Sequence, residues 1–179
     1  MRALLSSLLL IACVRAEPAV ERGAELTVVL VRHAEKGTEP KADPPLTPAG
    51  AERANQLIEA IAPLTFTAVI TTDFERTRAT AAPLAAKLNV TAERVDARAK
   101  DHAAQVAATA RARGGTVLVV GHSNTVTEII AALGAPKPAP ICEGEFDRLF
   151  IVHVPAAGAA TVEERRYGAR TEDESCRTP

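Results

Sequence analysis

The stretch that decides the fold is Val28-Val29-Leu30-Val31-Arg32-His33-Ala34-Glu35-Lys36, where an aliphatic run ends abruptly in an arginine and a histidine. A continuous run of this kind is typical of a strand that is buried on both faces of a parallel sheet. A second run, Thr116-Val117-Leu118-Val119-Val120, ends in Gly121-His122. Open α/β sheets bind ligands at the carboxyl ends of their strands, so the sequence predicts an anion-handling site at this edge.

Composition limits the broad class of protein. The chain has 179 residues, of which 47% are hydrophobic and 24% charged, and this suits one globular domain with a sizeable core. The formal net charge is −1, with dispersed lysines and arginines, so nucleic acid is not expected as a partner. No cysteine, histidine or carboxylate cluster has metal-ligand spacing. We expect a monomer that works without a metal ion or cofactor.

The amino terminus resembles an export signal. Arg2 precedes a short apolar segment, and residues 1–16 are predicted to be a signal peptide that is cleaved after Ala16. Alternatively, Leu10-Ile11-Ala12-Cys13 resembles a lipobox, in which case residues 1–12 leave and Cys13 carries a lipid anchor. The protein is thus predicted to be exported, either periplasmic or secreted, or else a membrane-anchored lipoprotein.

The remaining cysteines fit an oxidising compartment. Cys142 lies in a proline-rich loop and Cys176 lies in a polar tail, so a disulfide between them would hold the tail to the body. Two unrelated thiols are the alternative interpretation.

Strand and helix patterns alternate after residue 25. Strands are predicted over 26–31, 66–70, 90–95, 116–120, 148–154 and 161–166, and helices from Thr47-Pro48, from a cap at Asp73 to Leu88, over 101–113 and over 125–133. This order predicts an α/β fold, a three-layer α/β/α sandwich with a mostly parallel sheet. The domain is expected over 26–167, with a linker at 17–25 and a tail at 168–179. His102 is expected on an exposed helix face, and Glu128 in a capping box with Thr125.

Four motifs occur in one order along the chain. They are Arg32-His33-Ala34-Glu35-Lys36, Leu46-Thr47-Pro48-Ala49-Gly50, Thr71 to Ala81, and Val120-Gly121-His122-Ser123-Asn124-Thr125. Together they closely resemble the histidine phosphatase superfamily, which has the phosphoglycerate-mutase-like fold. The resemblance extends from about Leu26 to Val154.

The resemblance implies that His33 is the residue that becomes phosphorylated. A neutral imidazole can act as a nucleophile if a backbone acceptor holds its other nitrogen as a donor. Arg32 would bind the phosphoryl group with its planar guanidinium group. The family places a second arginine four residues before a Thr-Ala pair, and here Thr80-Ala81 selects Arg76. Arg76 also falls in the first turn of a helix, where anions are favoured, whereas Arg78 is expected to be solvated.

The second histidine, His122, is implied to donate a hydrogen bond to the phosphoryl group. Ser123 and Asn124 are candidates for phosphate binding, with helix capping as an equal alternative. Lys36 is either part of the positive rim of the pocket or a free surface lysine.

The proton donor is not apparent from the sequence. Asp101, Glu35 and Asp43 are weak candidates, and none lies in a family pattern for a general acid. A short chain without a recognisable acid is similar to the compact phosphohistidine-phosphatase branch.

The sequence therefore predicts a metal-independent phosphatase that hydrolyses a phosphomonoester or phosphoramidate through a phosphohistidine on His33. The substrate would be a small phosphorylated molecule, such as a saccharide phosphate of the cell envelope. A non-catalytic phosphate-binding or envelope-interaction module is the alternative, and a phosphoglycerate-type mutase is a third, less favoured one.

Overall fold

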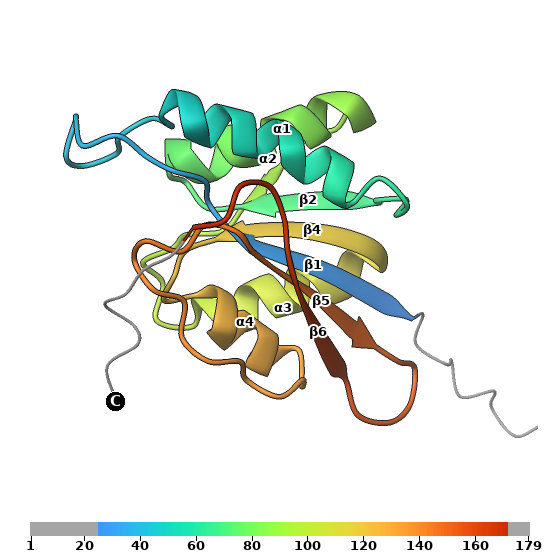
Figure 1. Ribbon diagram of the computed structural model, residues 1–179. Coiled ribbons are helices and arrows are strands. Elements are labelled where there is room, and N and C mark those ends of the chain that lie inside the picture. Colours follow the sequence, from blue (N-terminus) through green and yellow to red (C-terminus); the bar gives the residue numbers. More distant parts are fainter. Residues whose placement is uncertain (1–24, 172–179) are drawn as a thin grey trace, which may run out of the picture.

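The computed structural model describes residues 25–171, which form one six-stranded sheet flanked by four helices (Figure 1). The strand order is β3-β2-β4-β1-β5-β6. β1 pairs in parallel with β4 and antiparallel with β5, which confirms a mostly parallel sheet closed by an antiparallel pair. The strands are β1 (Leu26–Arg32), β2 (Ala68–Thr71), β3 (Glu93–Arg94), β4 (Gly115–Gly121), β5 (Arg148–Val154) and β6 (Thr161–Arg166).

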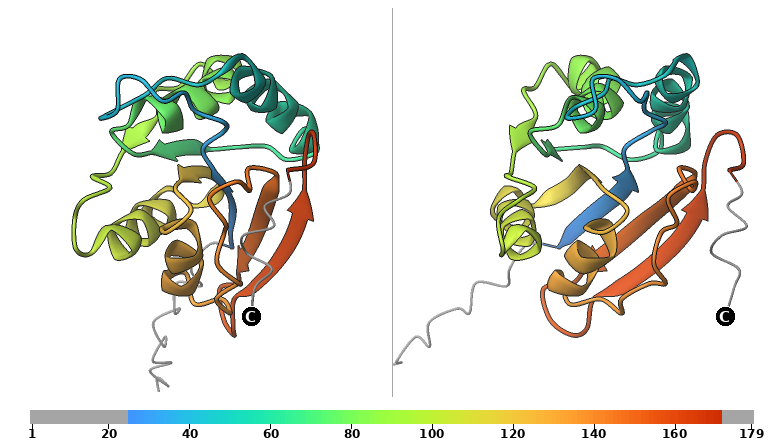
Figure 2. Two further views of the ribbon diagram at one scale, coloured as in Figure 1. Left: turned by 60° about the vertical axis from the view of Figure 1, so that its left-hand side comes forward. Right: turned by 90° about the vertical axis from the view of Figure 1, so that its left-hand side faces the viewer.

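The helices form two outer layers. Helices α1 and α2 cover one face of the sheet, and α3 and α4 cover the other, as Figures 1 and 2 show from three directions. This is the predicted α/β/α sandwich. The helices are α1 (Pro48–Ala60), α2 (Glu75–Leu88), α3 (His102–Arg113) and α4 (Val126–Ala132).

The central strand β1 supplies side chains to both halves of the core. Val28 and Leu30 pack in the cluster that contains residues of α3 and α4, whereas Val29 and Val31 pack in the cluster that contains residues of α1 and α2. All four are fully buried, and burial of each such side chain stabilises the fold by about 1.5–3 kcal/mol. Because both faces are covered, the chain needs the uninterrupted aliphatic run that identified this strand.

The helix starts differ in how well the sequence predicts them. Thr47 caps α1 as expected, since its Oγ1 accepts a hydrogen bond from the Gly50 amide at 3.1 Å, and Pro48 follows. The predicted cap of α2 at Asp73 is wrong, because the cap residue is Phe74 and it makes no side-chain cap bond. Instead, the Asp43 carboxylate accepts a hydrogen bond from the Glu75 amide at 3.0 Å.

Two further predictions on polar residues are wrong. His102 is only 5% exposed, because the start of α3 packs on the loop before it and places the imidazole Nδ1 2.9 Å from the Asp96 carbonyl oxygen. Glu128 forms no capping box with Thr125 and instead pairs with Lys137 at 2.5 Å. The Thr125 hydroxyl accepts a hydrogen bond from the His122 amide at 3.0 Å.

The start of α1 lies directly against the segment that follows β1. A Cβ on Gly50 would collide with the Glu35 carbonyl group, so only glycine permits this approach. The Thr47 amide also donates to that carbonyl at 2.9 Å. The second motif therefore supports the backbone that carries Arg32 and His33.

Several predictions lie outside the described residues. These are the signal peptide over 1–16 or 1–12, lipidation at Cys13, and the partner cysteine Cys176, and they stay predictions together with the domain boundaries. Cys142 is buried in the loop before β5. Within residues 25–171, no helix combines the length and hydropathy that a bilayer-spanning segment requires.

Candidate active site

The carboxyl ends of β1 and β4 bring the two motif histidines together. Arg32 stands opposite Gly121 in the parallel register, and the His33 amide donates to the Gly121 carbonyl oxygen at 2.9 Å. The rings of His33 and His122 lie edge to face, with their centroids 5.4 Å apart. Adjacent parallel strands thus place side chains from positions far apart in sequence at one edge, as the sequence predicts.

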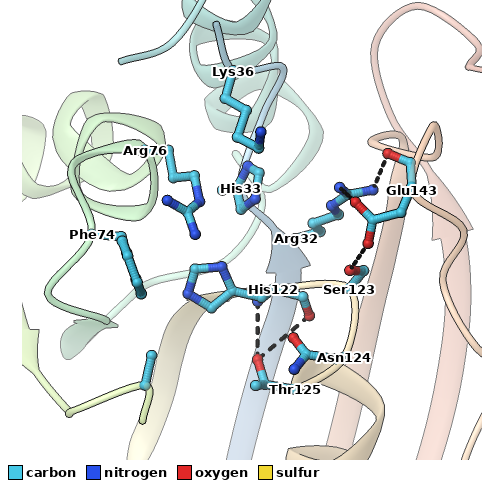
Figure 3. Close-up of a pocket in the computed structure, with 11 residues that line it drawn as sticks. Arg32, His33, Lys36, Phe74, Arg76, His122, Ser123, Asn124, Thr125 and Glu143 are labelled. Atoms are coloured by element: carbon cyan, nitrogen blue, oxygen red, sulfur yellow. Dashed lines mark hydrogen bonds and ion pairs between the residues drawn. The ribbon is translucent and has the colours of Figure 1, made fainter. Parts of the chain in front are cut away.

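A cavity of about 280 Å³ opens at this edge (Figure 3). His33 lies near its centre, with Arg32 and Arg76 on opposite sides of the imidazole and His122 below it in this view. The cavity is lined by Arg32, His33, Lys36, Phe74, Arg76, Ala97, His122, Ser123, Asn124, Thr125 and Glu143. All seven residues that the sequence analysis proposed for phosphate contact are in this lining.

His33 is held in one ring orientation by its own backbone. The imidazole Nδ1 lies 2.8 Å from the Ala34 carbonyl oxygen, and a carbonyl can only accept, so Nδ1 carries the proton and Nε2 carries a lone pair. The Ala34 amide in turn donates to Thr80 Oγ1 at 2.9 Å. Burial and the nearby cations Arg32 and Arg76 lower the pKa of His33 to about 3, so the ring is neutral near pH 7.

His122 belongs to a short chain of hydroxyl groups. Its Nε2 lies 3.1 Å from Thr72 Oγ1, which lies 2.9 Å from Thr77 Oγ1. The Thr77 hydroxyl also reaches the Phe74 carbonyl oxygen at 2.8 Å. Burial, with Arg76 close by, lowers the pKa of His122 to about 4. The second histidine is therefore also a neutral, fixed hydrogen-bonding group.

Arg32 is fixed by the loop between α4 and β5. Its Nη1 donates to the carbonyl oxygens of Cys142 and Glu143 at 2.7 Å and of Glu145 at 3.0 Å. The guanidinium also stacks over Phe146, 4.3 Å from the ring centroid. Its buried Nε has no hydrogen-bond partner among the described residues. This donor can bind an anion while the three carbonyl groups keep the arginine in place.

Arg76 is positioned by Asp43 and Phe74. Its Nη1 lies 3.5 Å from Asp43 Oδ1, and its guanidinium stacks 4.0 Å from the Phe74 ring centroid. Arg98 stacks near the same ring at 4.8 Å. As in Arg32, the Nε of Arg76 is buried and has no partner in the described part of the chain.

The neighbouring arginine of the same motif is directed elsewhere. Arg78 donates to the Asp73 carbonyl oxygen and does not line the cavity. The geometry therefore supports the choice of Arg76 over Arg78.

The three weak acid candidates do not line the cavity. Glu35 pairs with the buried Arg53 at 2.8 Å, and Arg53 also donates to the carbonyl oxygens of Tyr167 and Ala169. Asp43 caps α2 and pairs with Arg76, and Asp101 bonds Gln105 at 2.7 Å. All three carboxylates have structural contacts instead.

Sequence reasoning missed four lining residues, namely Phe74, Ala97, Thr125 and Glu143. Phe74 and Thr125 lie inside quoted motifs, so their proximity to the site could have been noticed. Ala97 and Glu143 lie on loops whose path over the site depends on tertiary packing. Among residues 25–171, no three His, Cys, Asp or Glu side chains are grouped so as to hold a metal ion.

Comparisons with known proteins find one family model that matches part of the chain. Residues 28–99 match the model of the histidine phosphatase superfamily (branch 1). A search of curated protein sequences finds no significant match.

Solved structures share the fold over about four fifths of this chain. The protein histidine phosphatase SixA in complex with tungstate superposes with a TM-score of 0.63 at 18% identity, covering 79% of this chain and 97% of that one. A protein assigned as phosphohistidine phosphatase SixA from Nakamurella multipartitia gives 0.56 at 25% identity, covering 82% and 98%. Phosphoglycerate mutase from Bacillus anthracis gives 0.58 at 17% identity, covering 80% and 94%. Residues 28–99 are thus similar to the histidine phosphatase superfamily (branch 1), and the chain shares the fold of these phosphatases and of the mutase.

Proposed function

We propose that the chain is a phosphatase that hydrolyses a phosphomonoester or phosphoramidate through a phosphohistidine on His33. The observation that carries this proposal is the pair of buried, unpartnered guanidinium Nε atoms of Arg32 and Arg76, which flank a neutral imidazole with a free Nε2 lone pair. Leaving buried donors unpaired costs about 1–3 kcal/mol each, and a phosphoryl group would satisfy both.

The geometry supports two displacement steps. His33 Nε2 attacks phosphorus and forms the P–N bond while the bond to the leaving group breaks, and water then attacks the phosphohistidine and releases phosphate. Arg32 and Arg76 neutralise the charge on the equatorial oxygens, and neutral His122 adds a hydrogen bond. Because two arginines supply this positive charge, we propose that no metal ion is required.

Trapping the intermediate tests the proposal. Incubation with radiolabelled phosphoester followed by an alkaline quench should leave label on the protein in an acid-labile, alkali-stable linkage. Labelling should be undiminished at about pH 5, where an unperturbed imidazole would be mostly protonated. The reason is the pKa of His33, which at about 3 keeps the ring neutral until the pH falls well below 5.

Two results would contradict the proposed phosphatase function. A chain that binds inorganic phosphate but neither forms the labelled species nor turns over 4-nitrophenyl phosphate is the non-catalytic binding module. Transfer of the label to a second hydroxyl of a sugar or glycerate phosphate, instead of to water, would identify a mutase. Addition of a chelator should leave turnover unchanged.

The proposed substrate is a small phosphorylated molecule, since the cavity of about 280 Å³ holds a phosphoryl group and a short leaving group. With the export signal predicted at residues 1–16, a saccharide phosphate of the cell envelope is the substrate class we propose. Amino-terminal sequencing of the exported protein should begin at Glu17, or find Cys13 blocked by lipid. Retention of Met1 and a wholly cytosolic location would rule out export.

A further inference from the structure

Glu143 contributes the only carboxylate in the lining of the cavity, as far as residues 25–171 are concerned. It comes from the loop between α4 and β5, and its side chain is 82% exposed. One carboxylate oxygen lies 3.0 Å from Arg32 Nη2, and the other accepts a hydrogen bond from Ser123 Oγ at 2.8 Å. In Figure 3 the carboxylate joins these two residues at the side of the cavity opposite Arg76.

These contacts involve groups that the phosphoryl group also needs. A phosphoryl group on His33 would compete with the Glu143 carboxylate for Arg32 and Ser123, and it carries more charge than the carboxylate does. The two anions would also repel each other if both stayed on the same guanidinium. Because the Glu143 side chain is largely exposed, it can turn aside while its backbone carbonyl still holds Arg32 at 2.7 Å.

We propose that Glu143 is the missing proton donor, which leaves Arg32 and Ser123 when the phosphoryl group binds and then protonates the leaving group. This inference rests on the phosphohistidine mechanism proposed above. It answers a requirement of that mechanism, because a general acid must be able to reach the reacting oxygen, directly or through one water. No other carboxylate of the described chain lines the cavity.

The step balances in protons and electrons. As the P–N bond to His33 forms, the electron pair of the breaking P–O bond goes to the leaving oxygen, and the Glu143 proton follows it. In the second step water attacks phosphorus, the P–N bond breaks, and the Glu143 carboxylate takes the proton of the water. When phosphate departs, the carboxylate returns to Arg32 and Ser123 and releases this proton to water, and it takes up one proton from water again when the next phosphoryl group displaces it.

The loss of Arg32 and Ser123 as partners also favours the protonated form of Glu143, which is the form that a proton donor needs. In the structure the Ser123 hydroxyl and Arg32 lower the pKa of this carboxyl, so it is ionised when it holds them. Once the phosphoryl group takes both partners, these interactions are lost and a negative neighbour is gained. Both changes raise the pKa and favour the acid form.

The dependence on the leaving group tests the proposal. In Glu143→Gln, the rate of phosphoenzyme formation from an alkyl phosphate should fall by about 10²–10⁴-fold. The rate from 4-nitrophenyl phosphate, whose leaving group needs little protonation, should change by less than about tenfold. Rapid-quench measurement of the labelled protein isolates this step from its hydrolysis. Glu128→Gln, which removes a carboxylate from the exposed face of α4, is the matched control and should leave both rates unchanged.

The other outcomes overturn the proposal. Equal losses with both esters would mean that Glu143 only supports the fold or the position of Arg32. Unchanged rates with tighter binding of inorganic phosphate would mean that it is only a competitor for the anion site. Retained labelling by the aryl ester shows that the variant is folded. Failure of the unsubstituted chain to form any phosphoenzyme would instead refute the proposed function.

Discussion

Replacement of His33 by alanine is expected to lower turnover of 4-nitrophenyl phosphate by about 10⁴-fold or more and to abolish covalent labelling. The imidazole is the group whose free Nε2 lies in the cavity between the two arginines, and it is 3% exposed. Without it the reaction would have to proceed by direct attack of water. The measurement is kcat/KM together with radiolabel on the quenched protein.

The same variant should still bind inorganic phosphate, because the contacts that orient Arg32 and Arg76 do not involve the imidazole of His33. Calorimetric titration with phosphate checks this and also shows that the pocket is intact. His153→Ala, an exposed site on β5, is the matched control and should retain full turnover. Turnover by His33→Ala within about tenfold of the parent chain would contradict a nucleophilic role.

Arg76→Ala and Arg78→Ala form a matched pair on one helix turn, with very different expected results. Arg76→Ala should lower kcat/KM by about 10²–10³-fold, since it removes a preorganised, buried donor to the transferring phosphoryl group. Arg78→Ala should lower it by less than about threefold, because that side chain contacts the Asp73 carbonyl and does not line the cavity. Steady-state measurement of kcat/KM for both variants tests this difference.

Arg76→Lys refines the same prediction. Lysine keeps the positive charge but lacks the planar guanidinium group and its stacking on Phe74. Arg76→Lys should therefore recover only part of the kcat/KM that Arg76→Ala loses. If Arg78→Ala were as damaging as Arg76→Ala, the assignment of the second arginine would be wrong. Thermal unfolding of all three variants separates a lost contact from a lost fold.

The strands and the main pocket were predictable because they depend on local patterns. The aliphatic run from Val28 to Val31 requires burial on both faces, and the placement of Arg32, His33 and His122 follows from the rule that parallel strand ends share an edge. Thr47 and Pro48 likewise specify a helix start by their own chemistry. These features can be predicted from residues that are close together in the sequence and from one general rule of sheet topology.

The features that were missed depend on contacts between distant segments. Asp43 caps α2 from a loop more than thirty positions earlier, and no local pattern indicates this. His102 is buried because the loop before α3 folds against it, although its helix pattern gave no sign of burial. Glu143 reaches the cavity only because Arg32 binds three carbonyl groups of its loop.

The position of β1 in the sheet has a consequence for the newly made chain. This strand is synthesised before the other five, yet its neighbours in the sheet are β4 and β5. Arg32 needs the loop at 142–145, and Glu35 is tied through Arg53 to the carbonyls of Tyr167 and Ala169. A nascent chain that has not reached this loop therefore carries His33 without the contacts that hold Arg32 beside it. The proposed site therefore assembles only after the segment from Cys142 to Ala169 has joined the fold.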